Sequence, residues 1–269
     1  MAIQWSLVLF TAIAGAGAWL FACVGASEFK TFGTKAAWPS SIVALVLLII
    51  GGFASLSHLS HPERVFGALG HPTSGIFTEA LLLGLTVLCV IVYMVLLKRE
   101  TGEKARKVLA VAGIVLTVVF TFACGSSYMM ASRATWNSIA LPLGYLGTAA
   151  ASGCSLYLLM CAIGKDDDAM GLAGLAAAGA GAAATVLSLV FGCTSGAAFG
   201  SDAPVFWVVV VVCGGAVPAV CGWLARKGGD KTLAYAAIAC AGGLAGSIAF
   251  RAVMWMVGTA VMNCFGATL

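Results

Sequence analysis

The chain has 269 residues, of which 61% are hydrophobic and 9% are charged, with a formal net charge of +4. Soluble domains carry about 25% charged residues, so this composition excludes a soluble globular protein. Several apolar runs exceed the roughly 18 residues typical of a membrane-spanning helix. We therefore expect an all-α membrane protein. Its first apolar run has no basic residues before it, which favours a retained helix over a cleaved signal peptide.

Eight apolar runs predict eight transmembrane helices in a single integral membrane domain, residues 1–269. Their expected bounds, in order, are about 6–26, 39–59, 76–97, 107–130, 138–163, 170–192, 203–225 and 232–262. The sixth consists mostly of glycine and alanine, so it is expected to pack closely against its neighbours. The connecting loops are short, which leaves no extramembrane domain to carry a catalytic centre.

Basic residues are distributed unevenly between the two ends of the predicted bundle. The first, third, fifth and seventh loops hold 11 of the 14 lysines and arginines. The opposite loops hold Arg64 and Arg133, and Arg251 lies within the eighth helix. Because cytoplasmic loops are enriched in Lys and Arg, both termini are predicted to be extracytoplasmic. The same rule places the loop between the second and third helices on the extracytoplasmic side.

That loop, within residues 57–79, contains all three histidines of the chain. His58 is expected at the outer end of the second helix, where it either favours a helix C-terminus as a cation or exchanges protons with a bound ligand. Glu79 either favours the positive N-terminus of the third helix or lines a polar pocket and accepts protons. His61 and His71 are interpreted as ordinary loop residues, although the choice between His58 and His61 as main proton acceptor stays open.

Three further residues are candidates for the same extracytoplasmic end. An arginine inside the membrane costs about 2.5–3.5 kcal/mol on insertion scales unless it is paired or reaches the interface, so Arg251 is expected to have a functional or structural partner, with Glu79 as one possibility. Arg64 is either an interface charge or part of the site. Trp136 is either a residue of the aromatic belt or stacks on an aromatic ligand.

The ten cysteines lie mostly within apolar runs, and none forms a CxxC pair. They are interpreted as small apolar residues at helix contacts, with a disulfide near one membrane face left open. No iron–sulfur or metal-ligand spacing is present. None of the histidines lies in the middle of a span, as the axial ligands of a membrane haem would. The sequence therefore predicts neither a metal nor a haem in this chain.

Three segments resemble the membrane anchor subunit of dimethyl sulfoxide reductases, the DmsC type. The run His58-Leu59-Ser60-His61-Pro62-Glu63-Arg64-Val65-Phe66, followed by Thr78-Glu79, resembles the family pattern His-Leu-Gly-x-Pro-x-Arg-Ala-Phe followed by Asn-Glu. Thr135-Trp136-Asn137-Ser138 with Pro142 is similar to its Pro-Thr-Trp-x-Ser…Pro pattern. The segment 246–255, with Arg251, is similar to its last-helix pattern Gly-Glu-x-x-Gly-Arg-x-x-Phe-Tyr. The order and spacing of the three segments make the resemblance specific, and it covers essentially the whole chain.

The resemblance implies a haem-free anchor in a bacterial cytoplasmic (inner) membrane, with its polar site on the extracytoplasmic side. It implies a four-cluster iron–sulfur subunit and a molybdopterin catalytic subunit as partners, and no nucleic acid. It also implies that the anchor binds and oxidises a quinol, usually menaquinol, and passes electrons to the iron–sulfur subunit. By position, His58 and Glu79 match the residues linked to quinol oxidation, while Arg64 and Arg251 match the basic positions; with Trp136 they form the expected quinol site.

Departures from the family pattern leave parts of this interpretation open. Ser247 stands where the family has a glutamate, so Arg251 must have a different partner. The terminal electron acceptor and the type of quinone do not follow from this chain. Two alternatives remain: a purely structural anchor, and a small-solute transporter. The crowding of polar residues at one end disfavours the transporter, which would have paired interrupted helices near the membrane midplane.

Overall fold

The computed structural model of this chain describes residues 3–29, 35–57, 67, 70–71, 73–258, 263–264 and 267–268. Within them, eight helical spans are long and apolar enough to cross a membrane, as predicted. Six are single helices: α1 Trp5–Ser27, α2 Ala37–Leu56, α3 Gly75–Lys98, α4 Glu103–Ser126, α5 Ala140–Gly164 and α6 Asp167–Ser195. The seventh comprises α7 Ala203–Val205, the π-helical segment η2 Phe206–Ala216 and α8 Val217–Ala225; the eighth is α9 Thr232–Val257. Two-residue antiparallel strands follow, β1 Asn263–Cys264 and β2 Ala267–Thr268.

The predicted spans are confirmed with small shifts at their ends. The second span ends at Leu56 rather than near residue 59, and the eighth ends at Val257 rather than near residue 262. The all-α expectation holds for the membrane part, to which the structure adds the short hairpin of β1 and β2. In the seventh span, the π-helical turns of η2 continue directly into the α-helix α8 at Val217, next to Pro218, which has no N–H to donate.

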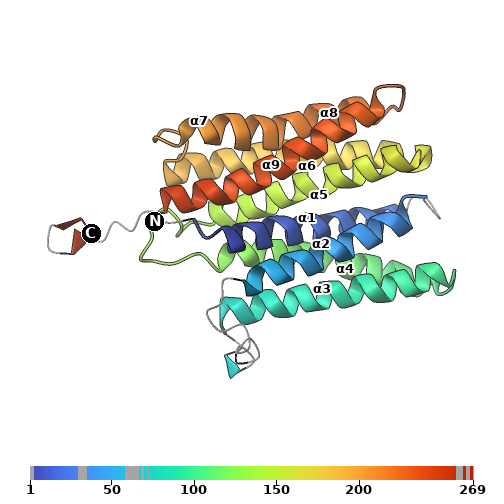
Figure 1. Ribbon diagram of the computed structural model, residues 1–269, viewed down its shortest axis with the longest axis horizontal. Helices are drawn as coiled ribbons and strands as arrows, with labels where there is room; N and C mark the ends of the chain where they lie inside the picture. Colours follow the sequence, from blue (N-terminus) through green and yellow to red (C-terminus); the bar gives the residue numbers. More distant parts are fainter. Residues whose placement is uncertain are drawn as a thin grey trace.

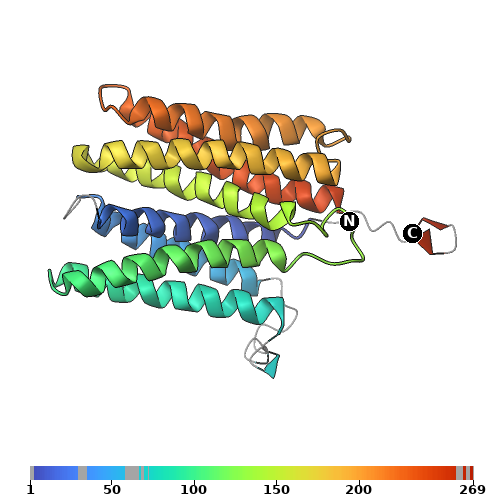
Figure 2. The same ribbon diagram turned by 180° about the vertical axis from the view of Figure 1, so that it is seen from behind.

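The eight spans lie roughly parallel in one bundle (Figure 1). The central helices are α1 and α5, which are the most buried of the spans and pack against each other. α1 also contacts α2 and α4, and α4 contacts α3; α5 contacts α6 and α9, and these two pack on the seventh span. The view from behind shows that α2, α3 and α4 lie on the α1 side of the α1–α5 contact, and that α6, the seventh span and α9 lie on the α5 side (Figure 2). α1 begins and α9 ends at the same end of the bundle.

Side chains define where two of the helices begin. The Ser74 hydroxyl accepts a hydrogen bond from the Phe77 amide at the start of α3, an N-cap interaction that satisfies one free N–H of the first turn. At the other end of the bundle, buried Asp166 caps α6 by accepting from the Ala169 amide, and it also accepts from the Ala36 amide at the start of α2. One carboxylate thus fixes two helix N-termini relative to each other.

Candidate functional site: a cavity at the Glu79 end of the bundle

A cavity of about 640 Å³ lies among α1, α2, α3 and the end of α4. Apolar side chains of α2 and α3 form most of its wall, among them Leu48, Phe53 and Leu83. The polar residues on its lining are Gln4, Ser55, Ser74, Glu79, Ser127 and Tyr128. The lining continues along α3 as far as Val87, two turns beyond Glu79. The cavity therefore combines a polar end, near the start of α3, with a deeper apolar part.

Glu79 lies in the second turn of α3 and is half-buried in the cavity wall. Its carboxylate interacts with the Ser127 side chain, which follows the end of α4. Close approach of the two helices makes this interaction possible, because a Cβ atom on Gly75 would lie 3.0 Å from the Ser127 hydroxyl oxygen. No salt bridge joins Glu79 to any residue that the structure describes. A carboxyl group with one hydroxyl neighbour, in a largely apolar cavity, can bind a polar ligand group and exchange a proton with it.

Arg251 is 1% exposed and lies between α9, α1 and α5 rather than on the cavity wall. Its Nε atom donates to the Thr11 hydroxyl at 2.8 Å, and one of its terminal nitrogens donates to the Ser247 hydroxyl at 2.7 Å and to the Thr148 hydroxyl at 3.3 Å. The guanidinium lies over the ring of Tyr145, with its central carbon 4.5 Å from the ring centroid. Within the described residues, no carboxylate lies within ion-pair distance of Arg251, so the pairing with Glu79 that the sequence left open is not formed.

Hydroxyl and carbonyl groups thus accept the hydrogen bonds of the buried Arg251 guanidinium. The Ser247 hydroxyl is one of these acceptors. A serine at this position keeps a hydrogen bond to the arginine while it removes the negative charge that a glutamate would supply. Arg251 consequently carries an uncompensated positive charge in the described part of the bundle. In a medium of low dielectric constant, such a charge acts over longer distances than it would in water.

Trp136 and its neighbours cap the last turn of α9. The Trp136 indole donates to the carbonyl of Met254 at 2.8 Å, the Thr135 hydroxyl to that of Val257 at 3.2 Å, and Arg133 to that of Gly258 at 2.6 Å. The last carbonyls of a helix have no partners within it, so the connection between α4 and α5 supplies them. Trp136 is 1% exposed and does not line the cavity.

Trp136 reaches the cavity indirectly, through an aromatic cluster that we define as Tyr128, Trp136, Tyr145 and Trp255. The ring of Tyr128 lies 6.0 Å from that of Trp136, 5.8 Å from that of Tyr145 and 6.0 Å from that of Trp255, centroid to centroid. Tyr128 also belongs to the cavity wall. This cluster therefore separates the cavity from Arg251, which stacks on its Tyr145 member.

The remaining predicted site residues, His58 and Arg64, lie outside the described residues, as does His61. His71 is described and exposed, and it is not part of the cavity lining. The structure thus brings Glu79 to a cavity and Trp136 and Arg251 to the cluster behind it. Sequence reasoning missed Tyr128, because the fourth span was predicted to run to about residue 130, and a single tyrosine near the end of a span matches the ordinary composition of a membrane interface.

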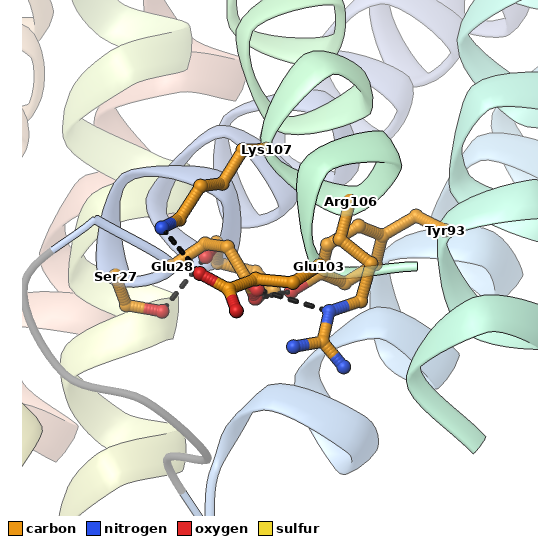
Figure 3. A network of polar contacts seen from close by, with 7 residues as sticks. Ser27, Glu28, Tyr93, Glu103, Arg106 and Lys107 are labelled. Atoms are coloured by element: carbon orange, nitrogen blue, oxygen red, sulfur yellow. Dashed lines mark hydrogen bonds and ion pairs between the residues drawn. The ribbon is translucent and has the colours of Figure 1, made fainter. Parts of the chain in front are cut away.

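A second polar group, also missed from the sequence, lies at the opposite end of the bundle (Figure 3). Glu28 at the end of α1 accepts a hydrogen bond of 2.8 Å from the Tyr93 hydroxyl of α3 and forms a 3.0 Å ion pair with Arg106 of α4. Glu28 is the first acid of the chain and stands at the end of a long apolar run, a signal that could have identified it. Nearby, Lys107 pairs with Glu103 on the surface of α4.

The described residues contain no group of three or more His, Cys, Asp or Glu side chains that could hold a metal ion. The side chains of nine of the ten cysteines are described, and all nine are free thiols. The sulfur atoms of Cys23 in α1 and Cys154 in α5 lie 3.4 Å apart. Most of the nine are buried at helix contacts, in agreement with the sequence interpretation.

Comparison with known proteins gives one family match. A search of curated proteins finds no relative of this chain. The family model described as DMSO reductase anchor subunit (DmsC) matches residues 1–193, which include α1 to α5, most of α6 and the Glu79 cavity. Arg251 lies beyond the matched residues. Because the match covers more than half of the chain, the protein belongs to the DMSO reductase anchor subunit (DmsC) family and is a multi-pass membrane protein of that kind.

Proposed function

We propose that this chain binds and oxidises a quinol in the Glu79 cavity, as the haem-free anchor of a molybdopterin oxidoreductase complex. The observation that carries the proposal is the position of Glu79, the carboxylate of an otherwise largely apolar cavity between membrane helices. Quinols are apolar molecules that diffuse within the bilayer and present two hydroxyl groups on one ring. A cavity with one polar end and an apolar remainder suits such a ligand.

The dimensions of the cavity support a quinol as occupant. Ligand pockets typically measure about 300–1,000 Å³, and the cavity, at about 640 Å³, lies within this range. A naphthoquinol ring near Glu79 would leave the first isoprenoid units to follow the apolar wall along α2 and α3 towards Leu48 and Val87. We propose menaquinol as that quinol, because the resemblance to the anchor family implies it.

Oxidation removes two protons and two electrons from the quinol and leaves the quinone. In our proposal, Glu79 accepts a proton from one ring hydroxyl and passes it to water, and His58 hydrogen-bonds the ring and accepts or relays the other. Arg64 and the buried charge of Arg251 stabilise the ring as it loses its protons. Trp136 supports the cavity wall through the ring of Tyr128. The two electrons pass one at a time to an iron–sulfur cluster of the partner subunit.

Membership of the family supports a complex with an iron–sulfur subunit and a molybdenum-containing catalytic subunit. We propose that the iron–sulfur subunit carries four clusters and docks at the Glu79 end of the bundle. The excess of basic residues at the other end supports an extracytoplasmic position for both termini and for the site. The membrane is then the bacterial cytoplasmic (inner) membrane.

The test uses the complex purified through this subunit. We expect molybdenum, iron–sulfur clusters and bound quinone to copurify, and Glu79→Gln to lower quinol-dependent reduction about 100-fold, as for loss of a general base. Glu103→Gln is the matched control, since Glu103 lies at the opposite end in a surface pair with Lys107. Reduction of the acceptor by an artificial electron donor should be unchanged in both variants.

Two outcomes would contradict the proposal. Unchanged quinol-dependent turnover in Glu79→Gln would leave a purely structural anchor. Uptake of a small solute by vesicles that contain this chain without its partners would instead indicate a transporter.

A further inference from the structure

We infer that Tyr128 binds the quinol directly, with its hydroxyl donating a hydrogen bond to a ring oxygen. The inference rests on the proposed function and adds a second polar contact to that of Glu79. Its starting point is the place of Tyr128 two residues beyond the end of α4, in the wall of the cavity.

The surroundings of Tyr128 fix the position of its ring. The side chain is 9% exposed, and three other rings of the aromatic cluster pack around it at centroid distances of 5.8–6.0 Å. Two of these contacts, with Trp136 and Trp255, are edge-to-face, the arrangement that aromatic pairs favour. A side chain held on several sides loses little further freedom when it binds a ligand, so its hydrogen bond is preorganised.

The hydroxyl of Tyr128 differs from that of Tyr145, the neighbouring tyrosine of the cluster. Tyr145 donates to the sulfur of Met254. Within the described residues, no group makes a hydrogen bond with the Tyr128 hydroxyl. The Tyr128 side chain is nine-tenths buried, but its hydroxyl is not among the fully buried oxygens that lack a partner, and the side chain borders a cavity. Its hydroxyl is therefore open to that cavity. A ligand in that cavity would supply the missing partner.

The phenol is chemically suited to donate rather than to take up a proton. Burial raises the pKa of the Tyr128 phenol above its ordinary value, so the group stays protonated at neutral pH. A protonated phenol can donate to the oxygen of the quinol and equally to the carbonyl oxygen of the quinone. Glu79, by contrast, accepts. The two side chains, from α3 and from the end of α4, give a donor and an acceptor on one cavity, which matches the two oxygens of a quinol or quinone ring.

The experiment measures steady-state kinetics of the whole complex with reduced 2-methyl-1,4-naphthoquinone as the electron donor. Tyr128→Phe removes one hydroxyl and keeps the ring in its cluster. Because a hydrogen bond contributes about 0.5–1.5 kcal/mol, KM for the naphthoquinol should rise about 2- to 12-fold while kcat changes less than twofold. The control is Tyr157→Phe, which makes the same chemical change at a buried tyrosine that does not line the cavity; its KM should stay at the wild-type value.

Three further outcomes separate the possible failures. An unchanged KM in Tyr128→Phe, with a large loss in Glu79→Gln, would overturn the inference and leave the proposed function standing. Equal losses in kcat and in complex yield for Tyr128→Phe would show a structural role and would also overturn it. If Glu79→Gln retains full turnover with the naphthoquinol, the proposed function fails and the inference fails with it.

Discussion

The Nε atom of Arg251 donates a 2.8 Å hydrogen bond to the hydroxyl of Thr11, which lies 240 positions earlier in the chain. The Thr11 carbonyl accepts a second bond from the same guanidinium at 3.2 Å. The last span is thereby joined to the first at a point that is inaccessible to water. A buried charge is costly unless it is hydrogen-bonded, and hydroxyl and carbonyl groups of Thr11, Thr148 and Ser247 accept from all three nitrogens of this guanidinium, with no carboxylate in ion-pair distance among the described residues.

Thr11→Val should therefore destabilise the bundle. The substitution keeps the volume of the side chain and removes the acceptor of Nε, and a lost bond to a buried charged group costs about 1.5–3 kcal/mol. A thermal unfolding curve of the detergent-solubilised protein measures the loss. Thr194→Val is the control, because the exposed Thr194 hydroxyl bonds only carbonyls of its own helix. Equal melting temperatures for the two variants would contradict the prediction.

Arg106→Leu should be strongly destabilising, because it leaves the buried carboxylate of Glu28 without its cation. Breaking a buried ion pair by removal of one partner costs about 3–5 kcal/mol. The double variant Glu28→Gln with Arg106→Leu should recover part of this loss, since no buried charge then remains. Lys104→Met, an exposed change in the same turn, controls for the loss of a positive charge. The yield and unfolding temperature of the four proteins distinguish these cases.

Trp136→Phe should loosen the last turn of α9. The phenylalanine ring keeps most of the aromatic contact with Tyr128 and Trp255 but cannot donate to the Met254 carbonyl. We expect a loss of about 1 kcal/mol and faster amide hydrogen exchange near the end of α9. Trp223→Phe, at an exposed position that stacks on Arg226, should leave exchange there unchanged. Wild-type exchange in Trp136→Phe would show that the cap is dispensable.

Gly153→Ala and Gly179→Ala should have opposite effects, although both place a methyl group within a helix. A Cβ atom on Gly153 would lie 2.6 Å from the Ala16 carbonyl oxygen and would also clash with the Trp19 Cβ, so α1 and α5 must separate. We expect a loss of about 1–3 kcal/mol from such overpacking. A Cβ on Gly179 meets nothing within 4 Å, and alanine favours the helix by about 1 kcal/mol. The thermal unfolding temperature of each variant in detergent shows whether the substitution lowers or raises the stability of the protein.

The proposed orientation in the membrane has a direct test. Ser201→Cys, in the connection between α6 and α7, should react with a membrane-impermeant maleimide in intact spheroplasts, because it lies at the end of the bundle where α1 begins. Glu100→Cys, between α3 and α4, should react only after the membrane is opened. Both changes are made in a background without exposed Cys193. The reverse pattern would place the Glu79 cavity at the cytoplasmic side.

The sequence was sufficient to predict the spans but only part of the candidate site. Long apolar runs identify helices such as α3 because the length and hydropathy of a run are enough to show that it can span a membrane. The bounds were least accurate at both ends of α4, which runs Glu103–Ser126 rather than about 107–130, and at the end of α9, whose last carbonyls are bound by Arg133 and Thr135. Partners in space were harder to predict, since nothing in the sequence pairs Arg251 with Thr11, or the Thr135-Trp136 segment with the last turn of α9. Glu79 was identifiable because an acid at the start of an uncharged run is conspicuous.

The depth of Glu79 has a consequence for energy conservation. It is the fifth residue of α3, about 6 Å along the helix axis from its first residue, so a proton that it releases has little of the bilayer to cross. Electrons taken by a partner docked at the same end would leave on that side as well. Turnover of a quinol at this position would move almost no net charge through the membrane field, and its rate should be nearly independent of the transmembrane voltage.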